Sequence, residues 1–359
     1  MKKLIIIQTV TPDYRNKFFQ FLNHKLQNNF SIYRGSYYFE PSVETDSTIF
    51  FAKTLNNYFI FKNRFLFQTG PFWKQIIKNN IIVLEMNPRI LSNWIILLVR
   101  RMFFMETVLW GHAWPRKGAT SKSDKLRNLM RLLANKIIVY TQSQKQELEL
   151  RMPNKKIYSA PNALYKKNEM LTNNNLKTIK NIIYVGRLTK KKKPLIMVKA
   201  FEIALKKLSK NVNLLIIGDG EEKQNITEYV NNNKIASRVY ILGHIGSYDK
   251  LRELYHSSLV SLSPGYVGLS ATQSLGFGVP MLVSRNENHS PEIESINDGV
   301  NALFFETNSE KNLSDKLLEI FNNQYYWIKQ RELICEDCKD KYSIESMAEP
   351  FINLLKHEA

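Results

Sequence analysis

Short aliphatic runs alternate along the chain with longer segments in which apolar residues recur every three or four positions. The first run is Lys3 to Gln8, KLIIIQ, and a helical pattern follows it from Arg15 to Gln27. Short apolar runs without polar alternation are typical of strands buried on both faces of a parallel sheet. Because a helical pattern follows these runs repeatedly, the sequence predicts βαβ units and an α/β fold.

The alternation occurs in both halves of the chain and predicts two doubly wound domains. The further strands predicted are 30–33, 48–51, 81–85, 107–110, 136–140, 156–159, 181–185, 213–217, 239–242, 258–262 and 281–284. The helices predicted are 91–104, 123–134, 143–151, 195–208, 221–231, 248–256, 269–277 and 309–321, with helices up to Ala359. Residues 166–180 are polar, rich in Asn and Lys and without periodicity, which is typical of a linker. We therefore expect domains at 1–165 and 166–340, and a C-terminal helix at 341–359 that crosses back to the first domain.

One stretch, Tyr58 to Phe67, combines aromatic and basic residues and allows three interpretations. Lys62 and Arg64 lie among five Phe and Tyr residues. Such interleaving occurs where nucleic-acid bases stack on aromatic rings, at membrane interfaces, and in aromatic cores whose cations reach out to solvent. The interpretation that we favour is the aromatic core.

The net charge of +19 is concentrated in the first half of the chain. Residues 1–165 contain 25 Lys and Arg against 9 Asp and Glu. We expect this half to face an anionic partner: membrane phospholipid, a lipid diphosphate or nucleic acid. The alternative is a basic surface that serves solubility only. The expected electrostatic anchor consists of Arg100, Arg101, Arg116, Lys117, Lys122, Lys125 and Arg127.

The cysteines and the longest apolar runs limit the class of protein. Cys335 and Cys338 are the two cysteines, so a disulfide framework is excluded. Their C-x-x-C spacing lies in a predicted charged helix and lacks a second pair, which favours structural thiols over a redox or zinc site. Neither a signal peptide nor a membrane span is apparent, and we expect a cytoplasmic protein, at most peripheral on the inner face of the membrane.

Glycine and basic residues follow several predicted strands directly. Gly186 with Arg187, Gly218 to Gly220, and Gly265 to Ser270 each come after a strand, and Lys192 lies a few residues beyond Arg187. The carboxyl ends of parallel strands lie at one edge of a sheet, so these loops should share a crevice. Arginine, lysine and the first turn of a helix all bind phosphate oxygens. A diphosphate site is therefore predicted there. His112 follows the strand 107–110 and is a candidate for chemistry, with a structural histidine as the alternative.

The same segments resemble the family 4 retaining glycosyltransferases of the GT-B fold, also called glycosyl transferases group 1. The matching segments are NIIYVGRLTKKKKPLIMVKAF from Asn181, LLIIGDGEE from Leu214, VYILGHI from Val239, LYHSSLVSLSP from Leu254 and GFGVP from Gly276, with looser matches at GHAW from Gly111, KIIVYTQSQKQEL from Lys136 and APNAL from Ala160. The resemblance implies two Rossmann-like domains facing across a cleft. It also implies that the second domain binds a nucleotide-sugar donor, that the first binds the acceptor, and that no metal or other cofactor is needed.

The resemblance assigns roles by position. It implies that His112, Arg187 and Lys192 are the catalytic residues. The donor-binding residues that it implies are Gly186, Arg187, Lys192, Gly218, Gly243, His244, Ile245, Gly268, Leu269, Ser270 and Gln273. The acceptor or membrane side is expected to include Tyr14, Arg15, Lys125 and Arg127.

This sequence departs from the family at two positions where the family carries glutamates eight residues apart. Here the two positions hold Gly265 and Gln273. Gln273 can still accept a hydrogen bond from a ribose hydroxyl, although more weakly than a carboxylate. We interpret the loop as a variant of an active enzyme.

The favoured hypothesis is a transferase that moves a hexosyl or deoxyhexosyl group from a nucleotide-sugar to a glycan acceptor. The acceptor is expected to be lipid-linked, as in the assembly of capsule, O-antigen or lipopolysaccharide. A non-catalytic nucleotide-sugar-binding protein of the same fold is the alternative that Gly265 and Gln273 suggest. Nucleic-acid binding rests on charge alone and is not expected.

Overall fold

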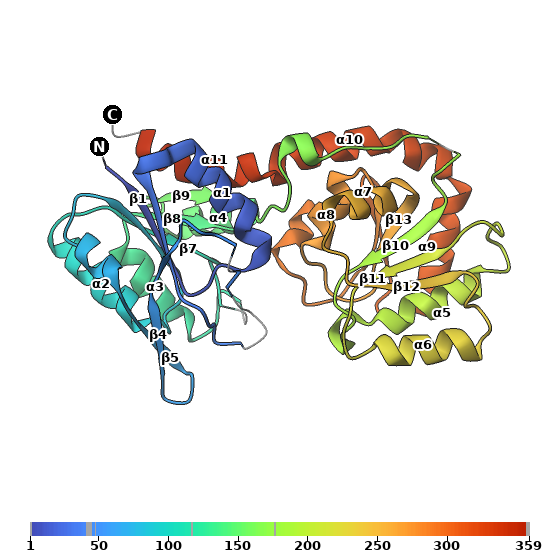
Figure 1. Ribbon diagram of the computed structural model, residues 1–359, viewed down its shortest axis with the longest axis horizontal. Coiled ribbons are helices and arrows are strands. Elements are labelled where there is room, and N and C mark those ends of the chain that lie inside the picture. Colours follow the sequence, from blue (N-terminus) through green and yellow to red (C-terminus); the bar gives the residue numbers. More distant parts are fainter. Residues whose placement is uncertain (1, 41–44, 47, 116–117, 176, 357–359) are drawn as a thin grey trace. The chain divides into compact units, whose positions relative to one another are not determined.

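The computed structural model describes residues 2–40, 45–46, 48–115, 118–175 and 177–356. The chain divides into two compact units (Figure 1). Unit 1 comprises Met1–Leu164 together with Ile344–Ala359, and unit 2 comprises Tyr165–Ser343. Each unit is built around its own parallel sheet, as the alternation of strand and helix patterns predicts.

Unit 1 contains a seven-stranded sheet in the order β3-β2-β1-β6-β7-β8-β9, and all its neighbouring strands pair in parallel. The strands are β1 (Leu4–Gln8), β2 (Phe30–Arg34), β3 (Lys53–Thr54), β6 (Ile81–Glu85), β7 (Thr107–Trp110), β8 (Lys136–Val139) and β9 (Lys156–Ser159). The helices are α1 (Asn16–Leu26), α2 (Leu91–Met102), α3 (Asp124–Leu133), α4 (Gln142–Arg151) and α11 (Ile344–Lys356). The strand order reverses between β1 and β6, so the loops that follow these two strands flank a topological switch point.

Helix α11 completes the core of unit 1. It packs against α1, where the rings of Phe18 and Phe351 lie 5.3 Å apart between centroids, in an edge-on arrangement. Trp110 from β7 contacts the same pair and is 1% exposed. The last helix of the chain therefore belongs to the core formed by the first 164 residues.

Two predictions for unit 1 are wrong. Residues 48–51, predicted as a strand, form turns. The aromatic stretch 58–67 forms most of a two-stranded antiparallel hairpin, β4 (Asn56–Ile60) and β5 (Phe65–Thr69), and not a core. Leu66 is buried, but Tyr58, Ile60, Phe61 and Phe65 are exposed. Local pattern alone did not reveal that this hairpin uses one face only for packing.

Unit 2 contains a six-stranded parallel sheet in the order β12-β11-β10-β13-β14-β15. Its strands are β10 (Asn181–Val185), β11 (Leu214–Ile217), β12 (Val239–Gly243), β13 (Ser258–Ser263), β14 (Met281–Ser284) and β15 (Ala302–Phe305). Numbered within the unit, this is the order 3-2-1-4-5-6 of nucleotide-binding Rossmann folds. The switch point lies between β10 and β13, so the loops after these strands are the expected place for a ligand.

Six helices cover this sheet. They are α5 (Pro194–Ala204), α6 (Lys223–Asn232), α7 (Tyr248–His256), α8 (Ser270–Gly276), α9 (Glu310–Asn322) and α10 (Gln324–Tyr342). Cys335 and Cys338 are buried, unpaired residues of α10 that contact the backbone carbonyls of Gly276 and Thr272. Burial raises the pKa of Cys335 to about 11 and that of Cys338 further. Two buried thiols bonded to backbone carbonyls are consistent with structural or incidental cysteines. Within the described residues, no helix is both long and apolar enough to cross a bilayer.

Candidate functional site

The glycine loops at the carboxyl edge of the unit 2 sheet are linked by backbone hydrogen bonds. The Gly186 amide donates to Ile217 O (3.0 Å), and the Gly218 amide donates to Gly243 O (2.8 Å). A Cβ atom on Gly218, whose φ is +145°, would lie 1.9 Å from Gly186 O. Glycine is therefore required at 218 for this close approach. The three predicted positions Gly186, Gly218 and Gly243 do lie together.

Lys192 reaches the loop that follows β13. Its Nζ donates to Tyr266 O (2.7 Å) and lies 3.5 Å from the centre of the Tyr266 ring. A Cβ atom on Gly268 would be 3.6 Å from the same ammonium group. Burial lowers the pKa of Lys192 to about 8, and Arg187 contributes to the lowering. The structure thus brings Lys192, Arg187 and the Gly265–Ser270 loop together at the switch point, with Arg187 exposed to solvent.

Gly265 lies against the backbone of the lysine run. A Cβ atom there would be 2.3 Å from Lys191 O and 2.7 Å from Lys192 Cα. These are backbone atoms, so a side chain at 265 requires one of the two segments to shift. The loop in this chain is therefore built for glycine, and the glutamate that the resemblance implies for this position has no room in this backbone arrangement.

A further loop, residues 285–292, contacts both the Gly265–Ser270 loop and the lysine run 190–193. Sequence analysis did not single out this loop. The Val267 amide donates to His289 Nδ1 (3.0 Å), and the Ser290 amide donates to Val267 O (3.0 Å). Glu287 forms an ion pair with Lys193 (2.5 Å). Glu292 is buried and its charge favours the ammonium form of Lys192. The role of this loop as a support becomes visible only through its hydrogen bonds with Val267. No local sequence pattern indicates that role.

The side chain of Gln273, which is predicted to contact the donor, bonds to two tyrosines in this structure. Its side chain is buried, its Nε2 donates to Tyr165 Oη (2.7 Å), and its Oε1 accepts from Tyr255 Oη (3.3 Å). Both ends of the amide are thus bonded within unit 2, inside a group of aromatic rings that includes Phe277. The side chain thus connects α8 to Tyr165 and Tyr255.

The remaining predicted residues of unit 2 lie in the loops next to this edge. His244 and Ile245 follow β12, and His244 is exposed. Leu269 immediately precedes α8, and Ser270 is its first residue. An amide in the first turn of a helix that lacks a partner can bind an anion. In α8 the Ala271 amide donates to Gly268 O (2.9 Å) instead.

In unit 1, His112 follows β7 in an exposed loop. Its ring centroid lies 4.8 Å from that of Tyr140, and its carbonyl accepts a hydrogen bond from Arg127 Nη1 (2.9 Å). Arg131 donates to the carbonyl of the next residue, Ala113 (2.6 Å). Although His112 is exposed, desolvation by the surrounding protein, together with Arg127 and Arg15, lowers its pKa to about 4. The imidazole is therefore neutral at pH 7.

Arg15, which is expected on the acceptor or membrane side, is buried. Its guanidinium donates to Tyr140 Oη (2.7 Å) and lies 4.6 Å from the centre of the Trp110 ring. Tyr14, its neighbour, is partly buried. Near Arg15, at the unit 1 switch point, Glu85 accepts hydrogen bonds from the Thr9 amide (2.5 Å) and hydroxyl (2.9 Å). Burial raises the pKa of Glu85, and Thr9 and Arg15 oppose the shift.

The predicted electrostatic anchor also needs correction. Arg100 is fully buried, where it donates to four backbone carbonyls, and Arg127 points inward to Met86 O (2.7 Å) as well as His112 O. Arg101, Lys122 and Lys125 are exposed. Arg116 and Lys117 lie outside the described residues. The guanidinium fork of arginine can satisfy several buried carbonyls at once, which a count of charges cannot reveal.

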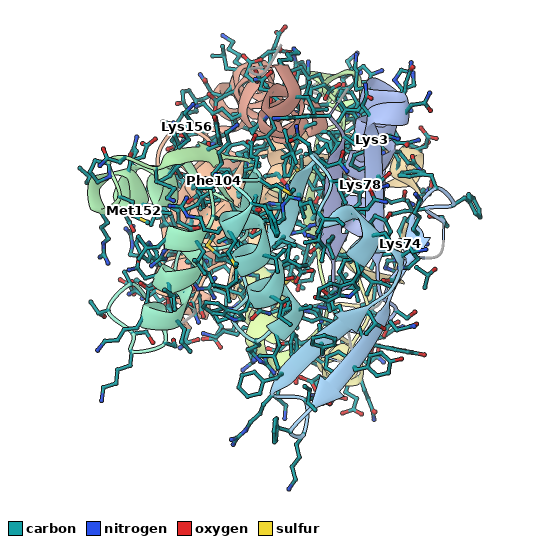
Figure 2. All side chains as sticks on the ribbon, turned by 90° about the vertical axis from the view of Figure 1, so that its left-hand side faces the viewer. Lys3, Lys74, Lys78, Phe104, Met152 and Lys156 are labelled. Carbon is teal, nitrogen blue, oxygen red and sulfur yellow. The ribbon has the colours of Figure 1, made fainter. Side chains whose placement is uncertain are left out.

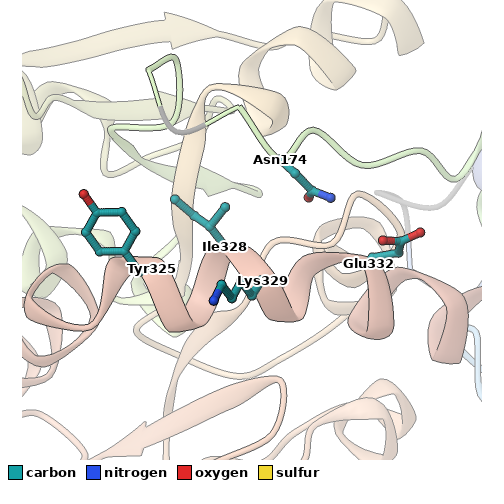
Figure 3. Close-up of a pocket in the computed structure, with 5 residues that line it drawn as sticks. All are labelled: Asn174, Tyr325, Ile328, Lys329 and Glu332. Carbon is teal, nitrogen blue, oxygen red and sulfur yellow. The ribbon is translucent and has the colours of Figure 1, made fainter.

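A hollow of about 300 Å³ lies elsewhere in unit 2, beside α10 (Figure 3). It is lined by Asn174, Tyr325, Ile328, Lys329 and Glu332, and contains none of the residues predicted for the site. Among the described residues, no cluster of three or more His, Cys, Asp or Glu side chains could hold a metal ion.

Solved structures of other proteins have the same fold as this chain. The structure of HepE from Anabaena in complex with UDP covers 99% of this chain and 100% of its own, with a TM-score of 0.69 and 11% identity. A glycosyltransferase from Rickettsia africae covers 99% of both chains, with a TM-score of 0.69 and 16% identity. The fold is that of the GT-B glycosyltransferases, as the sequence resemblance implies.

Residues 166–337 match the family model described as "Glycosyl transferases group 1". The matched segment makes up most of unit 2, and it is this part of the chain that is similar to the family.

Curated relatives are distant. A poly(ribitol-phosphate) alpha-N-acetylglucosaminyltransferase of Staphylococcus aureus is 23% identical over 66% of this chain and 47% of its own length. An uncharacterized glycosyltransferase of Methanocaldococcus jannaschii is 24% identical over 91% and 86%. A Campylobacter jejuni alpha-1,4-N-acetyl-D-galactosaminyltransferase, named for a glycan on PP-undecaprenol, is 27% identical over 48% and 47%. The match thus spans about half the length of two of these relatives.

Proposed function

We propose that this protein transfers a sugar from a nucleoside-diphosphate sugar to a glycan acceptor with retention of the anomeric configuration. The observation that carries the proposal is the grouping of Arg187, Lys192 and the Gly265–Ser270 loop at the switch point of unit 2. Two cations and the first turn of α8 form a suitable environment for a diphosphate.

The proposed chemistry follows from the leaving group. When the bond between the sugar and the diphosphate breaks, negative charge develops on the phosphate oxygens. Arg187 supplies a guanidinium fork and Lys192 an ammonium group to stabilise that charge. This scheme uses no metal ion or other cofactor. The departing phosphate then accepts the proton of the attacking hydroxyl, so that both events occur on one face of the sugar.

We assign His112 to the donor sugar on the resemblance of its Gly111–Trp114 motif. The neutral imidazole is suited to hydrogen bonding with a sugar hydroxyl or a phosphate oxygen, and it adds no charge at pH 7. The contacts of Arg127 and Arg131 with the carbonyls of His112 and Ala113 keep this loop in place.

The acceptor that we propose is a lipid-linked glycan, in the assembly of a cell-surface polysaccharide. The name of the Campylobacter relative, which refers to a PP-undecaprenol-linked glycan, supports this class of acceptor. The basic balance of the first 165 residues also favours an anionic partner such as lipid diphosphate or membrane phospholipid, and a location on the inner membrane face.

A panel of nucleotide-sugars, each supplied with and without an undecaprenyl-diphosphate-linked acceptor, tests this function. We expect one donor to yield a glycan longer by one sugar, with the anomeric configuration of the donor retained in the NMR spectrum of the product. Arg187→Ala should abolish transfer, whereas Lys191→Ala, which removes the same charge from the neighbouring lysine run, should not. Product with inverted configuration would refute the retaining mechanism.

The second candidate is a protein that binds nucleotide-sugars without transferring them. Gly265 and Gln273 favour it, because one has no side chain and the amide of the other is bonded inside unit 2. Nucleotide-sugar binding without release of nucleoside diphosphate, across the full panel of donors and acceptors, would support this candidate.

A further inference from the structure

Exposed large hydrophobic side chains are concentrated on one side of unit 1. Twelve of the twenty-four such side chains in the described residues belong to the β4–β5 hairpin, to α2 with the two residues after it, and to α3. They are Tyr58, Ile60, Phe61, Phe65, Ile95, Leu98, Met102, Phe103, Phe104, Leu126, Leu129 and Leu132. We call this set the apolar face of unit 1. The largest contiguous apolar patches of soluble monomers usually mark a docking site.

The three elements of the apolar face adjoin one another. Helix α2 packs against β5 on one side and against α3 on the other. Ile95, Leu98 and Met102 are spaced three and four residues apart on the exposed side of α2, and Phe104, 94% exposed, lies two residues beyond the end of the helix. Figure 2 shows this side of unit 1, with Phe104 labelled and the hairpin projecting below.

The hairpin presents its aromatic side outward because its other side is anchored. Leu66 is buried, and Arg89 donates to the carbonyls of Asn63 and Arg64 near the turn. Phe61, at φ +49° in the turn, is 72% exposed. Positive φ is unusual for phenylalanine, and such positions persist where the surrounding structure maintains them.

Exposed charges on the apolar face are basic. Lys62, Arg64, Arg101, Lys122 and Lys125 are exposed on or beside its three elements. Between Asp46 and Asp124 the sequence contains only two acidic residues, Glu85 and Glu106. Glu85 is bonded to Thr9, Glu106 pairs with Lys136, and Asp124 pairs with Arg131 (2.7 Å). Apolar side chains bordered by cations, with the neighbouring carboxylates paired, are complementary to an anionic lipid surface.

We propose that the apolar face of unit 1 binds the surface of an anionic membrane, with its aromatic and aliphatic side chains in the interface and its lysines and arginines at the lipid phosphates. Helix α3 connects this face to His112. Leu126 and Leu129 point outward, while Arg127 and Arg131 hold the carbonyls of His112 and Ala113. This inference rests on the proposed function. It adds which surface of unit 1 meets a lipid-linked acceptor.

Vesicle binding tests the inference without donor, acceptor or turnover, so its failure is distinguishable from failure of the transferase proposal. The wild type is sedimented with vesicles of phosphatidylcholine alone and of phosphatidylcholine mixed with phosphatidylglycerol, at physiological ionic strength. We expect binding to the mixed vesicles only, reduced about tenfold or more by the double variant Phe61→Ser/Phe104→Ser and by Lys62→Glu/Arg64→Glu.

The matched controls lie in unit 2. Tyr325→Ser/Leu333→Ser removes two exposed apolar side chains, each 65% exposed, and Lys206→Glu/Lys207→Glu makes the same change of charge. Both should bind vesicles like the wild type. If Phe61→Ser/Phe104→Ser fails to fold, Leu98→Gln/Met102→Gln replaces it.

Three results would overturn the inference. In the first, the wild type does not bind the vesicles that contain phosphatidylglycerol. In the second, variants of the apolar face bind vesicles as tightly as the controls. This result includes the case in which light scattering shows that the substitutions only dissociate a dimer. In the third, the wild type binds nucleic acid at physiological salt in preference to vesicles.

Discussion

The ammonium group of Lys192 loses hydration through burial, but its charge is suited to binding a phosphate. Burial, together with the nearby charge of Arg187, lowers its pKa to about 8, whereas the charge of Glu292 works in the opposite direction. Lys192 is therefore mostly charged at pH 7 and loses its proton as the pH rises through about 8. A bound diphosphate would favour the charged form, so binding and protonation of Lys192 are linked.

We expect the affinity for a nucleoside diphosphate to fall between about pH 7.5 and pH 9. Over this range the terminal phosphate is already ionised, since its second pKa is about 6, so the loss of positive charge on Lys192 dominates. Lys192→Arg should flatten the profile, because the pKa of arginine lies above about 12. Isothermal titration calorimetry at several pH values checks this. An equally steep profile in the variant would show that another group titrates.

Gly265 is a position where any side chain should destabilise the protein. A Cβ atom there meets the backbone of Lys191 and Lys192, so Gly265→Ala should reduce the free energy of unfolding by about 1–3 kcal/mol. Gly246→Ala is the control, since its nearest contact would be His244 Nε2 at 3.5 Å, and we expect a change within about 0.5 kcal/mol. Urea denaturation measures both. Equal stability of the two variants would contradict the crowding argument.

His289 is expected to position Val267 and, through it, the loop beside Lys192. Burial lowers the pKa of His289, with a contribution from Lys192 and opposing effects from Glu287 and the backbone of Arg285 and Ser284. The neutral ring accepts the Val267 amide through Nδ1. His289→Ala should raise KM for the donor about tenfold, and His289→Asn, whose Oδ1 can accept the same bond, should restore most of it. Equal KM values in the two variants would assign His289 a packing role only.

At the scale of elements, α10 supports the site through one buried arginine. Arg331 donates to Ser258 O (2.7 Å), Tyr255 O (3.3 Å) and Phe277 O (3.3 Å), which lie at the start of β13 and near the ends of α7 and α8. Burial lowers the pKa of Arg331 to about 10, so it stays charged at pH 7. A single side chain thus joins the helices and the strand on either side of the Gly265–Ser270 loop.

Replacement of Arg331 by lysine should destabilise the protein although the charge is kept. The ammonium group lacks the fork that reaches three carbonyls, and we expect a loss of about 2–4 kcal/mol in the free energy of unfolding. Arg285→Lys is the control, because its pair with Asp298 is exposed and should change stability by less than about 1 kcal/mol. Thermal denaturation distinguishes them. A small effect of Arg331→Lys would mean that water or lysine replaces the fork.

Sequence patterns predicted the elements of the parallel sheets well and the exposed hairpin poorly. Runs such as Ile81–Glu85 are strands because a strand buried on both faces has an unmistakable aliphatic sequence. The stretch 58–67 has one face packed and one exposed, and aromatic residues occupy both, so the pattern did not distinguish core from surface. The burial of Arg15 and Arg100 depends on carbonyls and rings far away in sequence, which no local pattern contains.

For the candidate site, the sequence predicted the loops but not the supports. Gly186, Lys192 and Gly268 follow parallel strands, and the rule that ligands bind at carboxyl edges identified them. The contacts of His289 with Val267 and of Gln273 with Tyr165 arise from tertiary pairing. The hydrogen-bonding capacity of glutamine was visible in sequence, but the tyrosines that use it were not.

At the scale of the whole molecule, the two units carry different polar groups at the corresponding place in their sheets. Each sheet reverses its strand order beside its first strand, and each carries polar groups at that point: Thr9 and Glu85 in unit 1, Gly186 and Lys192 in unit 2. The excess positive charge belongs to unit 1 and the diphosphate-binding groups that we propose belong to unit 2. This division is consistent with our proposals of a membrane-binding surface on unit 1 and a donor-binding site on unit 2.

The central claim is that the loops after β10 and β13 bind the diphosphate of a nucleotide. The most direct test is the dissociation constant of UDP, GDP, ADP, CDP and TDP for the wild type, Arg187→Ala, Lys192→Ala and Lys191→Ala. We expect at least one nucleotide to bind, with affinity reduced about tenfold to a hundredfold in the first two variants and unchanged in Lys191→Ala. Absence of binding to every nucleotide, or equal affinity in all four proteins, would contradict the account.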